Sequence, residues 1–115
     1  MSKNTTDISQ SKKLVEILPL ESADMIYTMT NGYHTPFIRI ETIQEMDKDD
    51  VCAWSLAALL EFLPEYNLQR TDWGNKTEYK IVVTVNEDNY ASKNYDNPLD
   101  ACYELILKLN ELKML

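Results

Sequence analysis

The pattern of apolar and polar positions predicts a β-hairpin in the first third of the chain. Residues 25–30 and 33–40 are both rich in β-branched, aromatic and long apolar side chains, and Asn31-Gly32 separates them. An Asn-Gly pair between two such runs favours a hairpin, because a type I′ turn requires positive φ at both central residues. A two-residue turn also fixes the register, so that Thr30 lies opposite the first residue of the second run.

This register divides the side chains of the hairpin between two faces. We expect the core face to be the one with more apolar side chains, namely Met25, Tyr27, Met29, His34, Pro36, Ile38 and Ile40. The outer face would then carry Ile26, Thr28, Thr35, Phe37 and Arg39. Proline has no N–H for a β-ladder, so Pro36 predicts a free edge on the second strand.

Two helices follow from apolar periodicity and capping signals. Ser55 is a good N-cap, Trp54 and Leu59 have the spacing of a hydrophobic staple, and Pro64 ends the segment. This first helix is therefore short, and it is apolar almost all round. The second helix, over residues 98–113, begins after Asn97 and has an apolar stripe with the spacing of one helix face.

The remaining segments give weaker signals. Residues 78–86 alternate as a strand, residues 86–89 form a turn, and residues 90–92 form a short return strand. Residues 66–77 are interpreted as a loop and residues 13–18 as a short helix. The polar residues 1–12 are expected to be a flexible lead, followed by a single domain over residues 13–115.

These elements predict an α+β fold in the order (short α)-β-β-α-β-β-α. The expected architecture has two layers, with a small antiparallel sheet of β-hairpins and two main helices packed on one face of it.

Composition removes several classes of function. The 115 residues include two glycines, one histidine and two cysteines, with 11 Lys and Arg against 19 Asp and Glu, for a net charge of −8. Two glycines cannot build a glycine-rich phosphate loop, and the histidine and cysteines cannot supply the four ligands of a standard structural zinc site. The acidic balance argues against direct binding of nucleic acid. We expect no cofactor and no metal.

The same composition indicates a compartment. The N-terminal residues lack the apolar stretch of a secretory signal, and no apolar run is long enough to cross a membrane. We therefore expect a soluble cytoplasmic protein without membrane association. Cys52 and Cys102, which both lie in apolar contexts, are expected to be buried free thiols.

No catalytic constellation emerges from the spacing. His34 could pair with Cys52 or Cys102 in principle, but nothing in the sequence brings them together, and we expect a protein without catalysis of its own. The carboxylates Glu45, Asp47, Asp49 and Asp50 lack the alternation and the glycine of an EF-hand loop. They are interpreted as a solvated acidic connector.

Aromatic residues suggest a surface. Tyr66, Trp73, Tyr90 and Tyr95 all fall in segments interpreted as loop or sheet edge. Such side chains either cover the ends of the sheet or form a partner surface, because tyrosine and tryptophan are enriched at interfaces. Trp73, beside Gly74, is the best single candidate.

Two sequence blocks resemble a known group of proteins. One is Cys52-Ala-Trp-Ser-Leu-Ala-Ala-Leu-Leu-Glu-Phe-Leu-Pro64, and the other is Asp96-Asn-Pro-Leu-Asp-Ala-Cys102. Together they are similar to blocks in small uncharacterised proteins of gut bacteria and their phages or integrated elements. The resemblance covers residues 50–115, with Cys52 where proline is expected. It implies an accessory protein of a mobile element and no particular activity.

The sequence thus predicts a non-catalytic protein that binds another protein. Residues 41–65 carry seven acidic residues and one lysine, while residues 1–40 and 66–95 are each neutral. The candidate partner surface therefore combines the four aromatic residues with Asp47, Asp49 and Asp50, and it favours a basic partner. One alternative is a small-ligand-binding or enzymatic domain that uses a pocket between sheet and helices. Another is an acidic mimic that inhibits a nucleic-acid-binding protein. Homodimerisation is compatible with all three.

Overall fold

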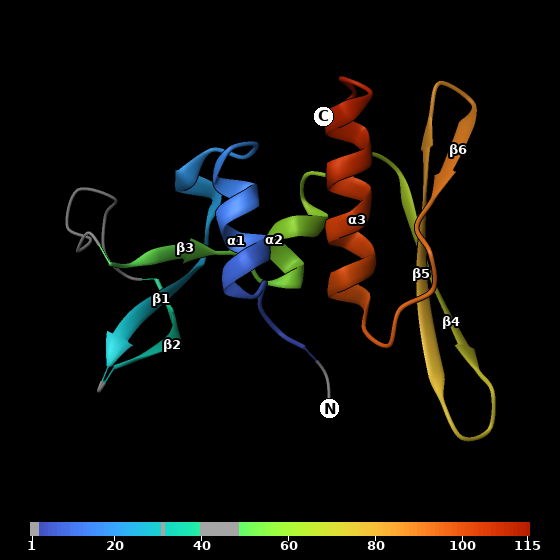
Figure 1. The fold of residues 1–115 in the computed structure, drawn as a ribbon. Coiled ribbons are helices and arrows are strands. Elements are labelled where there is room, and N and C mark those ends of the chain that lie inside the picture. Colours follow the sequence, from blue (N-terminus) through green and yellow to red (C-terminus); the bar gives the residue numbers. More distant parts are fainter. Residues whose placement is uncertain (1–2, 31, 40–48) are drawn as a thin grey trace. The chain divides into compact units, whose positions relative to one another are not determined.

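The computed structural model describes residues 3–30, 32–39 and 49–115. Its elements, labelled in Figure 1, are α1 (Ile8–Val15), a 3₁₀ turn (Leu20–Ser22), β1 (Met25–Thr30), β2 (Tyr33–Ile38), β3 (Val51–Ala53), α2 (Leu56–Leu60), β4 (Tyr66–Asp72), β5 (Thr77–Val85), β6 (Asp88–Ala91) and α3 (Pro98–Glu111). The strands form two three-stranded antiparallel sheets, which confirms the α+β class. Among the described residues, no helix combines the length and the apolar character needed to cross a membrane.

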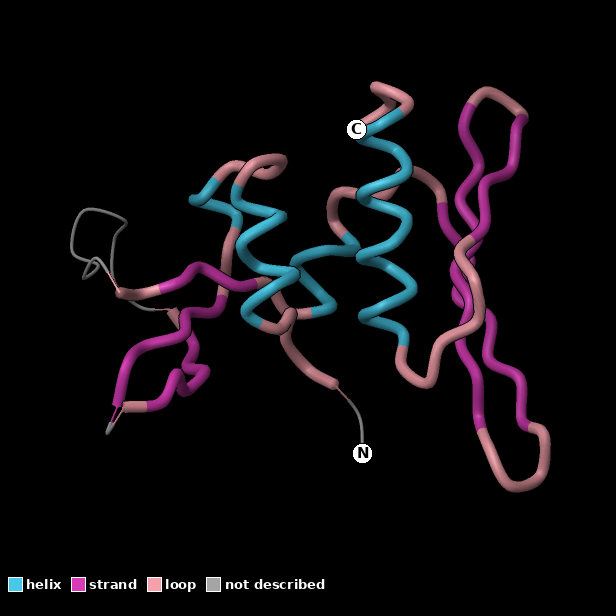
Figure 2. Tube along the Cα trace, in the orientation of Figure 1, coloured by secondary structure: helices cyan, strands magenta, loops and turns pink. Residues whose placement is uncertain are grey.

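The fold consists of two compact units. The N-terminal unit is Asn4–Ala58, and the C-terminal unit comprises Leu59–Leu115 together with Lys3. Each unit has its own sheet and its own longer helix, α1 in the first and α3 in the second (Figure 2).

The sheet of the N-terminal unit has the strand order β2-β1-β3. The β1–β2 register is the predicted one, with Thr30 opposite Tyr33 and Met25 opposite Ile38. Gly32 has a φ of +83°, as the second residue of the turn requires, whereas Asn31 lies outside the described residues. Among the described strands β2 lies at the edge of its sheet, as Pro36 predicts. β3 was not predicted, because three residues next to an acidic connector carry no periodic signal.

The predicted core face of this hairpin is wrong. Ile26, assigned to the outer face, is only 3% exposed and pairs with the buried Cys52 of β3. Ile38 and Met29, assigned to the core face, are 74% and 48% exposed. Both faces of the hairpin carry apolar side chains, so the pattern alone does not decide which face is buried. The burial of Ile26 accompanies its pairing with Cys52 of β3, a strand that the pattern did not predict.

The N-terminal helix begins earlier than predicted. Asp7 caps α1 through a full capping box with Gln10, in which the Asp7 carboxylate accepts from the Gln10 backbone at 2.7 Å. Thr6 precedes the cap and is fully buried, with its backbone N–H donating to the Trp54 carbonyl at 2.9 Å. Most of the segment that we expected to be a flexible lead is therefore helical or hydrogen-bonded to the residues that follow β3.

The C-terminal unit has the strand order β4-β5-β6. β5 matches the predicted strand, and β6 follows it after a two-residue turn at Asn86 and Glu87, whose φ values are +50° and +72°. β4 corrects the prediction of a loop over residues 66–77, because it pairs with β5 along all seven of its residues. The loop is confined to the residues around Trp73 and Gly74.

Helix α3 covers the middle of this sheet (Figure 1). Its predicted N-cap is confirmed, since the Asn97 side chain accepts from the Asp100 backbone at 2.8 Å and Pro98 occupies the first turn. The predicted stripe is fully buried at Leu99, Cys102, Leu105, Ile106 and Leu109. It packs on the sheet face that carries the buried Ile81 and Val83 of β5.

Helix α2 is shorter than predicted. It covers only Leu56–Leu60, and its N-cap is the predicted Ser55, whose hydroxyl accepts from the Ala58 backbone at 3.3 Å. Asp24 holds this cap in place by accepting hydrogen bonds from both the backbone and the hydroxyl of Ser55. Trp54 and Leu59, which have the spacing of a staple, are both fully buried.

Candidate functional site

The four aromatic residues singled out from the sequence lie in the C-terminal unit but do not form one patch. Tyr66 is 44% exposed at the start of β4, and Trp73 is 59% exposed just after its end. They lie at opposite ends of a seven-residue strand, which separates them along the sheet. Tyr90 and Tyr95 are half-buried.

Tyr95 has a structural partner. Its hydroxyl donates to Glu104 of α3 at 2.6 Å, and its backbone exchanges two hydrogen bonds with Tyr79 of β5. The hydrogen bond to the Glu104 carboxylate, together with burial, raises the pKa of Tyr95 to about 12. Glu104 also accepts from the Lys93 backbone at 3.2 Å. Through these hydrogen bonds, Glu104 of α3 holds the segment after β6 against the helix.

Lys108, one turn after Glu104 on α3, also contacts the end of β6. The Lys108 ammonium donates to the Ala91 carbonyl at 3.2 Å, while Glu104 binds Lys93 and Tyr95. This face of α3 thus holds residues 91–95 in place.

The acidic part of the predicted surface is only partly described. Asp47 lies outside the described residues, Asp49 is exposed, and Asp50 is half-buried directly before β3. The structure therefore places the end of the acidic connector beside the β2-β1-β3 sheet. The four aromatic residues belong to the other unit.

Neither cysteine thiol has the lowered pKa of an activated nucleophile. Cys52 and Cys102 are buried and free, and burial raises the pKa of each, to about 12 for Cys102. For Cys52 the nearby Arg39 guanidinium opposes this effect only in part. His34 is exposed on β2. The thiols therefore stay protonated, as expected for core side chains.

Polar groups in the interior are paired with one another. Within the described ranges, every buried side-chain nitrogen or oxygen has a hydrogen-bond partner. The most extensive buried set joins Thr6, Ser11 and Trp54. The Thr6 and Ser11 hydroxyls lie 2.8 Å apart, and the Trp54 backbone donates to the Thr6 hydroxyl at 3.1 Å. Across the part of the chain that the structure covers, no group of three or more His, Cys, Asp or Glu side chains could hold a metal ion.

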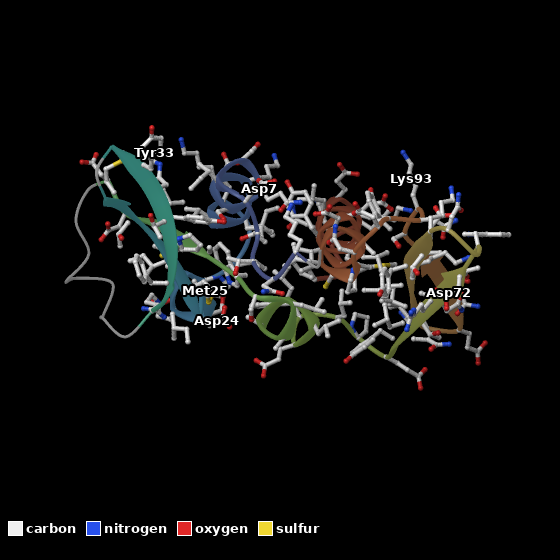
Figure 3. All side chains as sticks on the ribbon, turned by 90° about the horizontal axis from the view of Figure 1, so that it is seen from below. Asp7, Asp24, Met25, Tyr33, Asp72 and Lys93 are labelled. Carbon is white, nitrogen blue, oxygen red and sulfur yellow. The ribbon has the colours of Figure 1, made fainter. Side chains whose placement is uncertain are left out.

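The structure reveals an exposed apolar surface that sequence reasoning missed. We call Met29, Tyr33, Phe37 and Ile38 the hairpin surface; they are 48%, 76%, 49% and 74% exposed. Tyr33 and Phe37 alternate on one face of the hairpin, and Met29 and Ile38 lie on the other. Figure 3 labels Tyr33 at the end of the hairpin away from Asp24 and Met25. The sequence did contain a signal for this surface, because apolar side chains occur on both faces of the hairpin. A strand that is buried on one face needs them on that face only.

Comparison with known proteins adds no relative: no family model, no curated protein and no solved structure matches this chain.

Proposed function

We propose that the protein is a non-catalytic binding protein that contacts a partner protein through the hairpin surface. The observation that supports this proposal most directly is the exposure of four large apolar side chains on one two-stranded hairpin. Exposed apolar groups gathered in this way mark interaction sites in folded proteins, since leaving them in water has no stabilising effect on the monomer.

The shape of the hairpin indicates what kind of partner surface fits it. β2 is the outermost strand of its sheet, and all its residues except Thr35 are exposed. Because Tyr33 and Phe37 lie on one face and Met29 and Ile38 on the other, the hairpin can fill an apolar groove from both sides. Tyrosine supplies large contact area with a polar end, which makes Tyr33 the expected energetic centre.

The acidic sequence that follows β2 indicates which residues should border the partner's groove. The connector between β2 and β3, residues 41–50, carries five acidic residues and one lysine. In the chain it joins two strands of the same sheet, and its last residue, Asp50, directly precedes β3. A groove bordered by lysine and arginine side chains complements it and would be reached faster at low salt. We therefore propose a basic protein as the partner.

The biological setting belongs to the same proposal. The two blocks around Trp54 and Asn97 resemble those of small proteins of gut bacteria and their mobile elements. The structure explains both blocks as helix starts that support the core. An accessory protein of a bacterial or phage element that acts in the cytoplasm, by binding a host or element protein, is consistent with these features.

The test compares variants of the hairpin surface with a matched control. A partner captured reproducibly with the wild-type protein is purified, and its affinity is measured by calorimetry. Tyr33→Ser/Ile38→Ser is expected to weaken binding by about 30-fold, as loss of an aromatic hot spot does. Leu112→Ser/Leu115→Ser removes two apolar side chains that are 47% and 44% exposed elsewhere and is expected to leave the affinity unchanged.

Two results would contradict the proposal. One is the absence of any reproducible partner. The other is a partner whose affinity is unaffected by the hairpin variants but is lost when the carboxylates of residues 41–50 are neutralised. That second pattern would support an acidic mimic, in which charge and not apolar contact carries the binding.

A further inference from the structure

We infer that the free edge of β4 pairs with β4 of a second copy of this chain, in antiparallel orientation about a two-fold axis at Gln69. β4 is the outermost strand of β4-β5-β6 and is exposed along all seven residues, Tyr66–Asp72. Unpaired backbone groups on such an edge are a template for another strand.

The hydrogen bonds show which residues face outward. The backbone N–H of Thr84 donates to the Glu65 carbonyl at 2.9 Å, and the backbone N–H of Trp73 donates to the Lys76 carbonyl at 2.8 Å. Bonded and non-bonded pairs alternate along an antiparallel ladder, so the odd-numbered residues of β4 direct their backbone groups to β5. The even-numbered residues, Tyr66, Leu68, Arg70 and Asp72, direct theirs to the open edge.

The other sheet edges of the described chain are less able to pair. β3 and β6 have only three and four residues. After β2, the backbone N–H of Arg39 donates to the Asp24 carbonyl at 3.0 Å. Because bonded and non-bonded pairs alternate, the backbone of Pro36 faces outward from this sheet. An outward proline has no N–H to offer and interrupts strand addition. β4 contains no proline and no lysine, two residues that commonly protect an edge, and its two charges, Arg70 and Asp72, are of opposite sign.

The sequence of β4 is complementary to itself in a single register. With the axis at Gln69, Leu68 lies opposite Arg70 of the second copy and Tyr66 lies opposite Asp72, so all seven residues overlap and no like charges meet. Outward-facing residues pair only with outward-facing residues, so the register can shift only in steps of two. One shift would place Arg70 opposite its own copy, and the other would bring in Pro64, which lacks an N–H.

The side chains of the outward residues favour the same pairing. They share a sheet face with Ile81 and Val83 of β5, the residues beneath α3. Tyr66 and Leu68 remain 44% and 40% exposed at the margin of this face. A second copy in the proposed register covers both, and it brings the two Leu68 side chains to diagonal positions across the axis, within reach of each other.

Charge favours a second copy over a foreign acidic or basic strand. Residues 66–95, which contain the whole sheet, carry four acidic and four basic residues. Two such surfaces do not repel each other, although the complete chain has a net charge of −8. Arg70 and Asp72 also form an ion pair within β4, with a nitrogen–oxygen distance of 3.4 Å.

The test uses the full chain and a register-specific crosslink. Gln69→Cys places two thiols opposite each other at the axis in a non-hydrogen-bonded pair, within the Cα spacing that a disulfide accepts. Oxidised glutathione, which accepts the two electrons as the thiols lose their protons, is expected to give a covalent dimer. Asn67→Cys is the matched control on the same face of β4. Its two copies lie four residues apart in register, so it should stay monomeric on a denaturing gel.

A second measurement addresses the association itself. Sedimentation equilibrium should show a concentration-dependent dimer of the wild-type protein. Leu68→Lys places a lysine opposite Arg70 of the second copy, and the two-fold axis repeats this like-charge contact. The substitution should therefore raise the dissociation constant by about tenfold. Thr71→Lys adds the same charge on the other face of the strand and should not. A wild-type monomer at every concentration, or equal crosslinking of Gln69→Cys and Asn67→Cys, would overturn the inference.

Discussion

A few buried hydroxyl groups hold the N-terminal segment in the fold. Thr6 and Ser11 are both completely buried, and together with the Trp54 backbone they form a closed set of hydrogen bonds. Tyr27 adds a contact by donating to the Thr6 carbonyl at 2.8 Å. A buried polar group contributes little while it is paired, but it costs free energy when its partner is removed. These residues therefore matter more for specificity than their size suggests.

Ser11→Ala is expected to destabilise the protein by about 1 kcal/mol, because it removes one of the two hydrogen-bond partners of the buried Thr6 hydroxyl and leaves the Trp54 N–H as the other. Ser9→Ala is the matched control in the same helix. Ser9 is exposed, and alanine favours helices, so this change should be neutral or slightly stabilising. Urea denaturation of the two variants measures the difference. Equal stability of the two variants would contradict the importance of the buried pair.

At the scale of elements, local signals in the sequence predict much of what is observed. Asn31-Gly32 fixes the β1–β2 register, and the caps at Ser55 and Asn97 predict where α2 and α3 begin. Asp7 and Gln10 form an equally local signal, but the surrounding polar residues concealed it. The short β3 and the edge strand β4 were missed for a different reason. An edge strand exposed on both faces needs no alternation, so Asn67 and Gln69 gave no sign of a strand.

The candidate surfaces were harder to predict, because exposure depends on packing between distant segments. Nothing in the hairpin sequence says that Ile26 is buried against Cys52 and that Ile38 is not. Tyr66 and Trp73 were recognised as exposed aromatic residues, yet their separation along β4 could be seen only once β4 was known to be a strand.

Tyr95 connects the sheet of the C-terminal unit to α3, and Tyr95→Phe should reveal this connection through pH. The folded-state pKa of Tyr95 is raised to about 12 from a usual value of 10.0, chiefly by the hydrogen bond to Glu104. The stability that this bond contributes is therefore fully present below pH 10 and is lost as the pH rises toward 12. The variant should be less stable at neutral pH, by about 1 kcal/mol for a partly exposed bond, and should lose less stability between pH 10 and 12.

Tyr33→Phe serves as the control for this experiment, since it removes the hydroxyl of a tyrosine that is 76% exposed. Its stability should follow that of the wild-type protein across the same pH range in thermal melts. A wild-type decline that Tyr95→Phe reproduces unchanged would show that Glu104 does not hold the tyrosine in solution.

For the molecule as a whole, we expect repulsion among acidic groups to outweigh attraction between surface ions. The net charge is −8. Two of the described ion pairs join largely exposed groups and contribute little, Lys13–Glu16 at 3.8 Å and Arg70–Asp72 at 3.4 Å. A third, at 3.7 Å, joins the exposed Lys76 to the half-buried Glu78. The less exposed pair of Lys3 and Asp100, at 2.9 Å, is better shielded from salt.

Adding salt should therefore stabilise the protein. Raising the NaCl concentration to about 0.5 M shortens the screening length well below the 10 Å that holds near 0.1 M, and the melting temperature is expected to rise by a few degrees. Choline chloride, which screens equally but offers no sodium, should give the same increase. A melting temperature that falls with salt would mean that the ion pairs dominate after all.

The two buried thiols have a practical consequence for spectroscopy. A cysteine introduced at an exposed position would be the only readily alkylated sulfur in the native protein, because burial keeps Cys52 and Cys102 protonated. Fluorophores or spin labels could then be attached at single chosen positions without first replacing the native cysteines. The same two sulfurs would become reactive only on unfolding, which makes them an internal reporter of the unfolded fraction.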